Sequence, residues 1–438
     1  MKKIGIILKR SPTAIASIAA IIAIPLLSVF IFPQSLVKKE LAVENCRLQR
    51  WRISKESISN SSVSTSTQQK PVIPPLLPTE KPVFPCCQGD MSCFDKQLWG
   101  KNNRSADKQA LITSLDRSLK YLQSPSTEIT YKKFEKSGIT RNRVIKSLQR
   151  FRQLLLQSKS ATELNTALAK EFTFYQSLGR DNQGTVLFTA YYEPLYIASR
   201  VATPEFRYPI YKLPPDIKTW SRPHPTRLEL EGADGLQGSK GKLKGLEIFW
   251  FRDRLEPVLI QIQGSAKLQF IDGSQTSVGY AGNVAHNYQS IGKALVDDGK
   301  IPTDKIDMPA IFDYFKKYPQ DLDIYIPRDP SFVFFQENFG APAQGSIQVA
   351  LTPDRSIATD KSLMPPGALA MIRSKFPFVD SNGNIEQKIV SRYVLDQDTG
   401  GAIKGPGRVD YFVGTGKIAG DRAGVTISNG QLYYLLLK

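Results

Sequence analysis

Two aspartates near the C-terminal end of the chain, Asp398 and Asp410, flank a loop that is crowded with glycine. The residues before this loop, 389–395, are rich in strand formers, and 409–413 show the period of two that is typical of a strand. Glycine allows positive φ and lets a ligand approach the backbone closely, so the loop could aim a carboxyl group at a substrate for acid–base chemistry. The alternative is a β-hairpin loop with two solvated aspartates, which is the commoner use of such residues.

The elements that must position these aspartates are predicted from the spacing of apolar residues. Helical spacing recurs over 111–122, 144–155, 164–172 (after the capping pair Ser160 and Glu163), 287–298 and 308–318. Runs typical of strands occupy 185–194, 208–215, 246–251, 258–266 and 331–335. In particular, 246–251 and 258–266 are predicted to be two strands joined through Asp253 and Glu256. The fold is therefore expected to be mainly β with accessory helices.

Length and charge set broad limits on the class of protein. A chain of 438 residues can hold two or more domains with well-buried cores. The 58 Lys and Arg residues exceed the 40 Asp and Glu residues and give a net charge of +18. This charge is spread along the chain without dense basic runs, so it gives weak support for an anionic polymer as partner and does not favour nucleic acid.

Histidine and cysteine usage argues against metal chemistry. His224 and His286 are the only histidines, so a site with several histidine ligands is impossible and a histidine-dependent triad would have to use one of them. The cysteines lie outside the predicted globular part, without Cys-x-x-Cys spacing, at Cys46, Cys86, Cys87 and Cys93. One or two disulfides could form there in an oxidising compartment, and their pairing is open. We expect no metal and no cofactor.

The N-terminal segment predicts export. Basic residues precede the apolar run 14–32, which at roughly 20 residues is long enough to cross a bilayer. Residues 1–39 are predicted to be an uncleaved signal anchor, with a cleaved signal peptide as the alternative. Residues 40–105 are rich in Ser, Thr and Pro, carry the cysteines, and are predicted to form an extended linker.

Several stretches, in this order and spacing, resemble one known family. They are 188–194 (FTAYYEP), 208–211 (YPIY), 261–265 (QIQGS), 280–283 (YAGN), 290–295 (SIGKAL), 382–383 (NG), and 397–405 (QDTGGAIKG) continuing to Asp410. Together they resemble the membrane-bound lytic murein transglycosylase A family, whose C-terminal domain is of the three-aspartate type. The resemblance runs from about residue 164 to residue 438.

The resemblance implies a two-domain enzyme of the bacterial cell envelope, on the periplasmic face. Residues 106–195 and 336–438 would form a double-psi β-barrel catalytic domain, and the inserted residues 196–335 would form a second β domain on the other side of a glycan groove. The implied reaction cleaves the β-1,4 bond between N-acetylmuramic acid and N-acetylglucosamine and leaves a 1,6-anhydromuramoyl end. Peptidoglycan strands and the membrane are the implied partners, and a monomer is expected.

The resemblance also implies roles for particular residues. Asp410 matches the single acid/base and Asp398 matches a second aspartate of the groove. The positions expected to bind substrate are Thr189, Tyr191, Tyr192, Glu193, Glu256, Gln261, Gln263, Gly264, Ser265, Gly400, Gly401 and Lys404. The chain departs from the family in two places: Ala266 stands where glycine is usual, and Glu256 stands where an aspartate is usual.

A single carboxylic acid suffices for this reaction if the C6 hydroxyl group of the muramic acid is the nucleophile. Asp410 must then be protonated before reaction, so its pKa is expected to be raised by burial and by the like charge of Asp398. Lys404 and Arg408 are expected to face solvent or the substrate. The alternatives are a hydrolytic glycosidase on the same fold that uses both aspartates, and a glycan-binding module without catalysis.

Overall fold

The computed structural model describes residues 74–79, 94–100, 106–380 and 382–438. The predicted anchor over 1–39, all the cysteines, and the predicted linker apart from 74–79 and 94–100 lie outside the described residues. Where the chain is described, no helix combines the length and the apolar character that a membrane span requires.

The first described helices form where helical spacing predicts them. They are α2 (Lys108–Leu122), α3 (Ser126–Tyr131), α4 (Arg141–Gln157) and α5 (Ala161–Glu171). Ser160 caps α5 by accepting a hydrogen bond from the backbone N–H of Glu163 at 3.1 Å, as predicted. The apolar faces of α2 and α4 pack against strands of the main sheet, so these helices support the sheet that carries the two aspartates.

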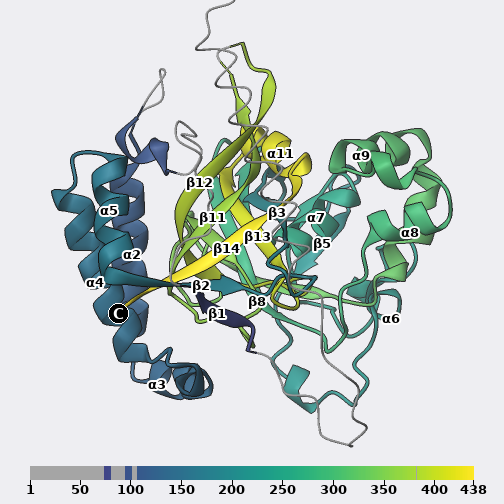
Figure 1. Cartoon of the computed structure of the whole chain (residues 1–438). Coiled ribbons are helices and arrows are strands. Elements are labelled where there is room, and N and C mark those ends of the chain that lie inside the picture. The colour runs from purple at the N-terminus through teal and green to yellow at the C-terminus, as the bar shows by residue number, and fades with distance from the viewer. Residues whose placement is uncertain (1–73, 80–93, 101–105, 381) are drawn as a thin grey trace, which may run out of the picture. The chain divides into compact units, whose positions relative to one another are not determined.

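Six strands form a closed barrel. In order around it they are β14 (Ile427–Leu437), β11 (Leu369–Val379), β12 (Ile385–Asp398), β10 (Ser356–Ala358), β13 (Arg408–Thr415) and β3 (Val186–Glu193). The barrel closes because β3 pairs with β14 as well as with β13. These strands are coloured olive to yellow in Figure 1, apart from the teal β3. β2 (Phe172–Ser177) and β1 (Leu76–Thr79) extend the sheet from β14.

The strands on either side of the glycine-rich loop form as predicted, but they are not a hairpin. β10 lies between them, parallel to β12 and antiparallel to β13. Val409, Tyr411 and Val413 are buried in the main core, in agreement with the period of two in the sequence. The strand that separates β12 from β13 therefore sets how far apart the two aspartates lie.

A second group of strands follows β3 in the sequence. β4 (Leu195–Ala198), β7 (Ser265–Phe270), β8 (Gln275–Asn283) and β9 (Val333–Glu337) form one sheet in that order, and β5 (Tyr208–Tyr211) pairs with β6 (Glu247–Phe251). The helices among and after them are α6 (Arg227–Glu231), α7 (Leu255–Gln263), α8 (Ile291–Asp297), α9 (Met308–Lys317), α10 (Leu322–Tyr325) and α11 (Lys417–Gly424). Short 3-10 helices occupy Lys96–Trp99, Lys132–Ser137, Ile217–Thr219, Gly238–Lys240, Thr303–Lys305, Pro319–Asp321 and Ile326–Arg328.

The strand predicted over 258–266 is wrong for most of its length, because 255–263 form the helix α7. The alternating β-branched residues Val258, Ile260 and Ile262 favoured a strand. Ile262 is nevertheless exposed while Val258 and Leu259 are buried together, which is the helical pattern. Gly264, with φ at +81°, ends the helix, and its N–H donates to the carbonyl of Ile260 at 2.8 Å.

Candidate active site

The two aspartates lie in one row that crosses four strands of the barrel. Ala358 on β10 pairs with Asp398 on β12 and with Asp410 on β13, and Asp410 pairs with Thr189 on β3. Residues paired across neighbouring strands direct their side chains to the same face of a sheet. Two strand spacings, roughly 10 Å, thus separate the backbones of the aspartates, with Ala358 at the paired position between them. We call these four residues the aspartate row.

Asp410 is bound by two neighbouring donors. The hydroxyl group of Thr189 donates to Oδ1 of Asp410. Arg408 donates from Nη2 to Oγ1 of Thr189 at 2.8 Å and to Oδ1 of Asp410 at 3.3 Å. The expectation that Arg408 faces solvent is therefore wrong, and its contact with the substrate stays a prediction. Arg408 and Asp410 lie on the same face of β13 because they are two residues apart on one strand. The guanidinium group of Arg408 is therefore able to turn toward the carboxyl group of Asp410.

The environment of Asp410 keeps its carboxyl group protonated up to a higher pH than is usual for an aspartate. Burial raises the pKa of Asp410 to about 6, the Arg408 cation opposes this rise, and the negative charge of Asp398 adds to it. The side chain of Asp410 is 21% exposed, so a substrate oxygen can still reach it. An acid whose pKa lies close to the working pH can both donate and accept a proton.

Asp398 is held by three hydrogen bonds at the end of β12. The hydroxyl group of Tyr191 donates to Oδ2 at 2.8 Å, and the backbone N–H groups of Ser346 and Thr399 donate to Oδ1, each at 2.8 Å. Burial raises the pKa of Asp398 against the effect of these donors. The neighbouring Gln397 is buried and bonded to Ser356, which fixes the end of the strand.

The predicted residues 192–193 lie at the end of β3. The backbone N–H of Tyr192 donates to Oε1 of Gln263 at 3.0 Å, which joins β3 to α7. Glu193 is buried, and its Oε2 accepts a hydrogen bond from Thr415 at 2.8 Å. Within the described part of the chain its Oε1 has no partner, and burial raises the pKa of this carboxyl group.

The remaining predicted residues of the inserted segment lie on α7 and at its ends. Gln261 is buried, and its Oε1 accepts from Arg227 at 2.8 Å, so its amide oxygen is already used inside the protein. Ser265 is buried at the start of β7, directly after Gly264. Glu256 lies in the first turn of α7, where burial raises its pKa to about 7.

Three predicted residues of the glycine-rich loop complete the set. Gly401 and Lys404 are exposed, and Gly400 is half-buried. A side-chain carbon at Gly401 would lie 3.6 Å from Cβ of Tyr288, so this part of the loop passes close to the segment before α8. Among the described residues, no group of three His, Cys, Asp or Glu side chains is arranged to hold a metal ion.

Two charged residues close to Asp398, Asp396 and Lys361, were not predicted from the sequence. Asp396 is completely buried, and it accepts hydrogen bonds from Thr359 and Tyr434, each at 2.7 Å, and from the ammonium group of Lys361. Lys361 also donates to the carbonyl oxygen of Asp398. A carboxylate two residues before Asp398 in an otherwise apolar run was the available indication, because such a charge needs a partner when buried.

Comparisons with known proteins identify the family to which the described part of the chain is similar. Residues 187–336 match the MltA specific insert domain, and residues 355–436 match the 3D domain. The chain is 34% identical over 264 residues to the membrane-bound lytic murein transglycosylase A of Escherichia coli K12, which covers 60% of this chain and 68% of that protein.

Solved structures of two proteins with similar names have a fold similar to that of this chain. The crystal structure of E. coli MltA with bound chitohexaose is 27% identical, with a TM-score of 0.59 over 76% of this chain and 90% of that chain. The membrane-bound lytic murein transglycosylase from Agrobacterium tumefaciens is 26% identical, with a TM-score of 0.60 over 76% and 93%. The sequence matches and the likeness to these solved structures show that the chain belongs to the membrane-bound lytic murein transglycosylase A family.

Proposed function

We propose that the protein is a peptidoglycan lytic transglycosylase in which Asp410 is both the acid and the base. The observation that carries this proposal is the aspartate row, where a buried carboxyl group with a pKa of about 6 remains partly open to a substrate. The relatives named above are lytic murein transglycosylases, and one of them was crystallised with chitohexaose.

The reaction needs two proton transfers, one from Asp410 and one back to it. Asp410 donates its proton to the glycosidic oxygen as the bond from that oxygen to C1 of the muramic acid breaks. The C6 hydroxyl group of the same sugar then bonds to C1, and its proton passes to the Asp410 carboxylate. The products are a chain with a free hydroxyl group and a chain with a 1,6-anhydro end, and Asp410 is again protonated. Attack within one sugar has the advantage of proximity.

Asp398 would stabilise the positive charge that develops at C1. The donors from Tyr191, Ser346 and Thr399 favour its carboxylate form, although burial opposes ionisation. A carboxylate that is already oriented costs no reorganisation when the charge appears.

The change Tyr191→Phe tests this role. It removes one donor and leaves the ring, which lies 5.3 Å from the ring of Phe412 between centroids. We expect kcat/KM for release of anhydro products to fall about threefold, the value of one modest hydrogen bond. Tyr208→Phe, on β5, is the matched control. An unchanged kcat/KM in Tyr191→Phe would contradict the role of this bond.

Finer features of the family are part of the same proposal. We propose a double-psi barrel built from residues 106–195 and 336–438, with an inserted domain over 196–335 and the glycan groove between them. The parallel pairs β10–β12 and β3–β13 support the barrel type. The residues at the ends of β3 and α7, together with Gly400, Gly401 and Lys404, would line the groove. The chain would work at the cell envelope, on the periplasmic face, held by its N-terminal segment.

Product analysis tests the proposed function directly. Purified protein is incubated with peptidoglycan, and the released fragments are examined by mass spectrometry. We expect 1,6-anhydromuramoyl ends, which are one water lighter than reducing ends. Reducing ends would instead support a hydrolase, and the two strand spacings between the aspartates also allow an inverting one. Binding to sacculi without any release would support a glycan-binding module.

A further inference from the structure

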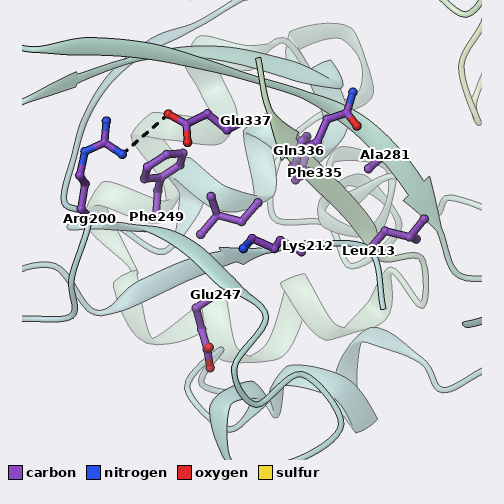
Figure 2. Close-up of a pocket in the computed structure, with 10 residues that line it drawn as sticks. Arg200, Lys212, Leu213, Glu247, Phe249, Ala281, Phe335, Gln336 and Glu337 are labelled. Carbon is purple, nitrogen blue, oxygen red and sulfur yellow. Dashed lines mark ion pairs between the residues drawn. The ribbon is translucent and has the colours of Figure 1, made fainter. Parts of the chain in front are cut away.

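The second group of strands contains a pocket that includes none of the predicted site residues. Its volume is about 510 Å³, and residues of β6, β8 and β9 and of the segments after β4 and β5 line it (Figure 2). A volume of this size is typical of sites for small ligands or short peptides. Its floor is apolar, because Phe249 and Phe335 are almost fully buried beneath it.

One wall of the pocket holds a charged pair in a fixed position. The guanidinium group of Arg200 lies 4.2 Å from the centre of the Phe270 ring and 3.7 Å from a carboxylate oxygen of Glu337. Thr276 fixes Glu337 by donating a hydrogen bond at 2.7 Å. The Arg200–Glu337 distance is too long for a hydrogen bond, and the Arg200 side chain is 54% exposed, so its donors remain available to a ligand.

The pocket also holds two charges that do not pair with each other. Figure 2 shows Lys212 in the middle of the lining residues and Glu247 at one side of them, with its carboxylate pointing away from the other side chains. Within the described residues, neither side chain forms an ion pair or a hydrogen bond. The pocket thus offers cationic and anionic groups above an apolar floor, and a ligand that carries both signs of charge would match them.

We propose that this pocket binds the peptide that is attached to the muramic acid of the substrate, an inference that rests on the proposed function. The N-acetylated sugars are neutral, so they give no reason for charged groups of both signs. The attached peptide carries terminal carboxylates, a side-chain ammonium group and small apolar side chains. Arg200 and Lys212 would bind the carboxylates, Glu247 would bind the ammonium group, and the half-buried Leu213 and Ala281 would contact the methyl groups.

The test compares two substrates. One is peptide-bearing glycan strands, and the other is the same strands stripped of peptide by an amidase. For the native protein we expect KM to be about fivefold lower with the peptide-bearing strands, since exposed charge pairs contribute modestly. In the double variant Arg200→Gln/Lys212→Gln we expect the two KM values to converge, with kcat and KM on stripped strands unchanged. Arg207→Gln/Lys218→Gln removes the same charge from exposed positions nearby and is the matched control.

A second arm identifies the ammonium contact. Acetylation of the peptide's ammonium group should raise KM in the native protein and should have no effect in Glu247→Gln. Equal KM values for the two substrates in the native protein, or a double variant that behaves like its control, would overturn the proposal. Anhydro products on stripped strands in every variant would show that the proposed function holds even if this inference fails. The absence of anhydro products on both substrates would overturn the proposed function itself.

Discussion

The change Asp410→Asn is expected to lower the release of anhydro products by about 10³-fold or more, because one group supplies both the acid and the base step. An amide cannot donate a proton to the glycosidic oxygen, and it cannot accept the proton of the C6 hydroxyl group. It can still accept the hydrogen bond from Thr189, so the strand pairing around position 410 should survive. The measurement is the rate of anhydro-product release by mass spectrometry, beside a sedimentation assay with sacculi.

Binding separates a chemical defect from a folding defect in this variant. We expect Asp410→Asn to sediment with sacculi as well as the native protein does. The matched control is Asp421→Asn on α11, whose carboxylate is 46% exposed and pairs with Lys417. Turnover near the native rate in Asp410→Asn would rule out Asp410 as the acid and base.

Much of the site could be predicted from sequence because its strands are local patterns. The runs before and after the glycine-rich loop alternate or cluster apolar residues, and both form strands. What the sequence could not indicate is β10, a strand of three residues that lies between them. Pairing between strands depends on contacts far apart in the chain, so a short strand leaves little pattern. The hairpin alternative was wrong for this reason.

The helix α7 shows the opposite difficulty. Its sequence fits both periods, since Val258, Ile260 and Ile262 alternate while Leu255, Val258 and Leu259 follow helical spacing. Packing decides between the two: Val258 and Leu259 are buried on adjacent positions, and Ile262 is left exposed. Short apolar runs of this kind are ambiguous until their tertiary contacts are known.

The orientation of Arg408 was also beyond a reading of the sequence. Two positions before Asp410, it lies on the same face of β13, and that face could have been turned toward solvent. The pairing of Asp410 with Thr189 brings a hydroxyl group within reach of both side chains, and Arg408 donates to both. A cation therefore lies beside an acid that must be protonated to work. Arg408 disfavours the protonated form of Asp410, but it also stabilises the carboxylate that forms during the reaction, so its two effects on the rate are opposite.

The change Arg408→Gln is expected to move the fall of the pH–rate profile to higher pH and to lower the rate on the acid side of that fall. Arg408 favours the carboxylate, so its loss should raise the pKa of Asp410 above about 6 and move the fall in activity to higher pH. Asp398 is the other charged group that acts on this pKa, and it is unchanged. Below the pKa, where both proteins are protonated, the variant should be slower by roughly 10- to 100-fold. The reason is that a charge-assisted hydrogen bond to the carboxylate formed in the transition state is lost.

A merely structural role for Arg408 would lower the rate at every pH by the same factor and would leave the midpoint of the profile in place. The profile of kcat/KM across the acid and neutral range distinguishes the two cases, with Lys417→Gln as the control for loss of one exposed positive charge. Arg408→Lys should restore part of the midpoint shift, because the charge remains. It should restore less of the rate, because an ammonium group lacks the planar fork that reaches Thr189 and Asp410 together. Arg408 would then make Asp410 a stronger acid while keeping fewer molecules protonated, and the profile separates these two effects because one changes the rate at low pH and the other moves the midpoint.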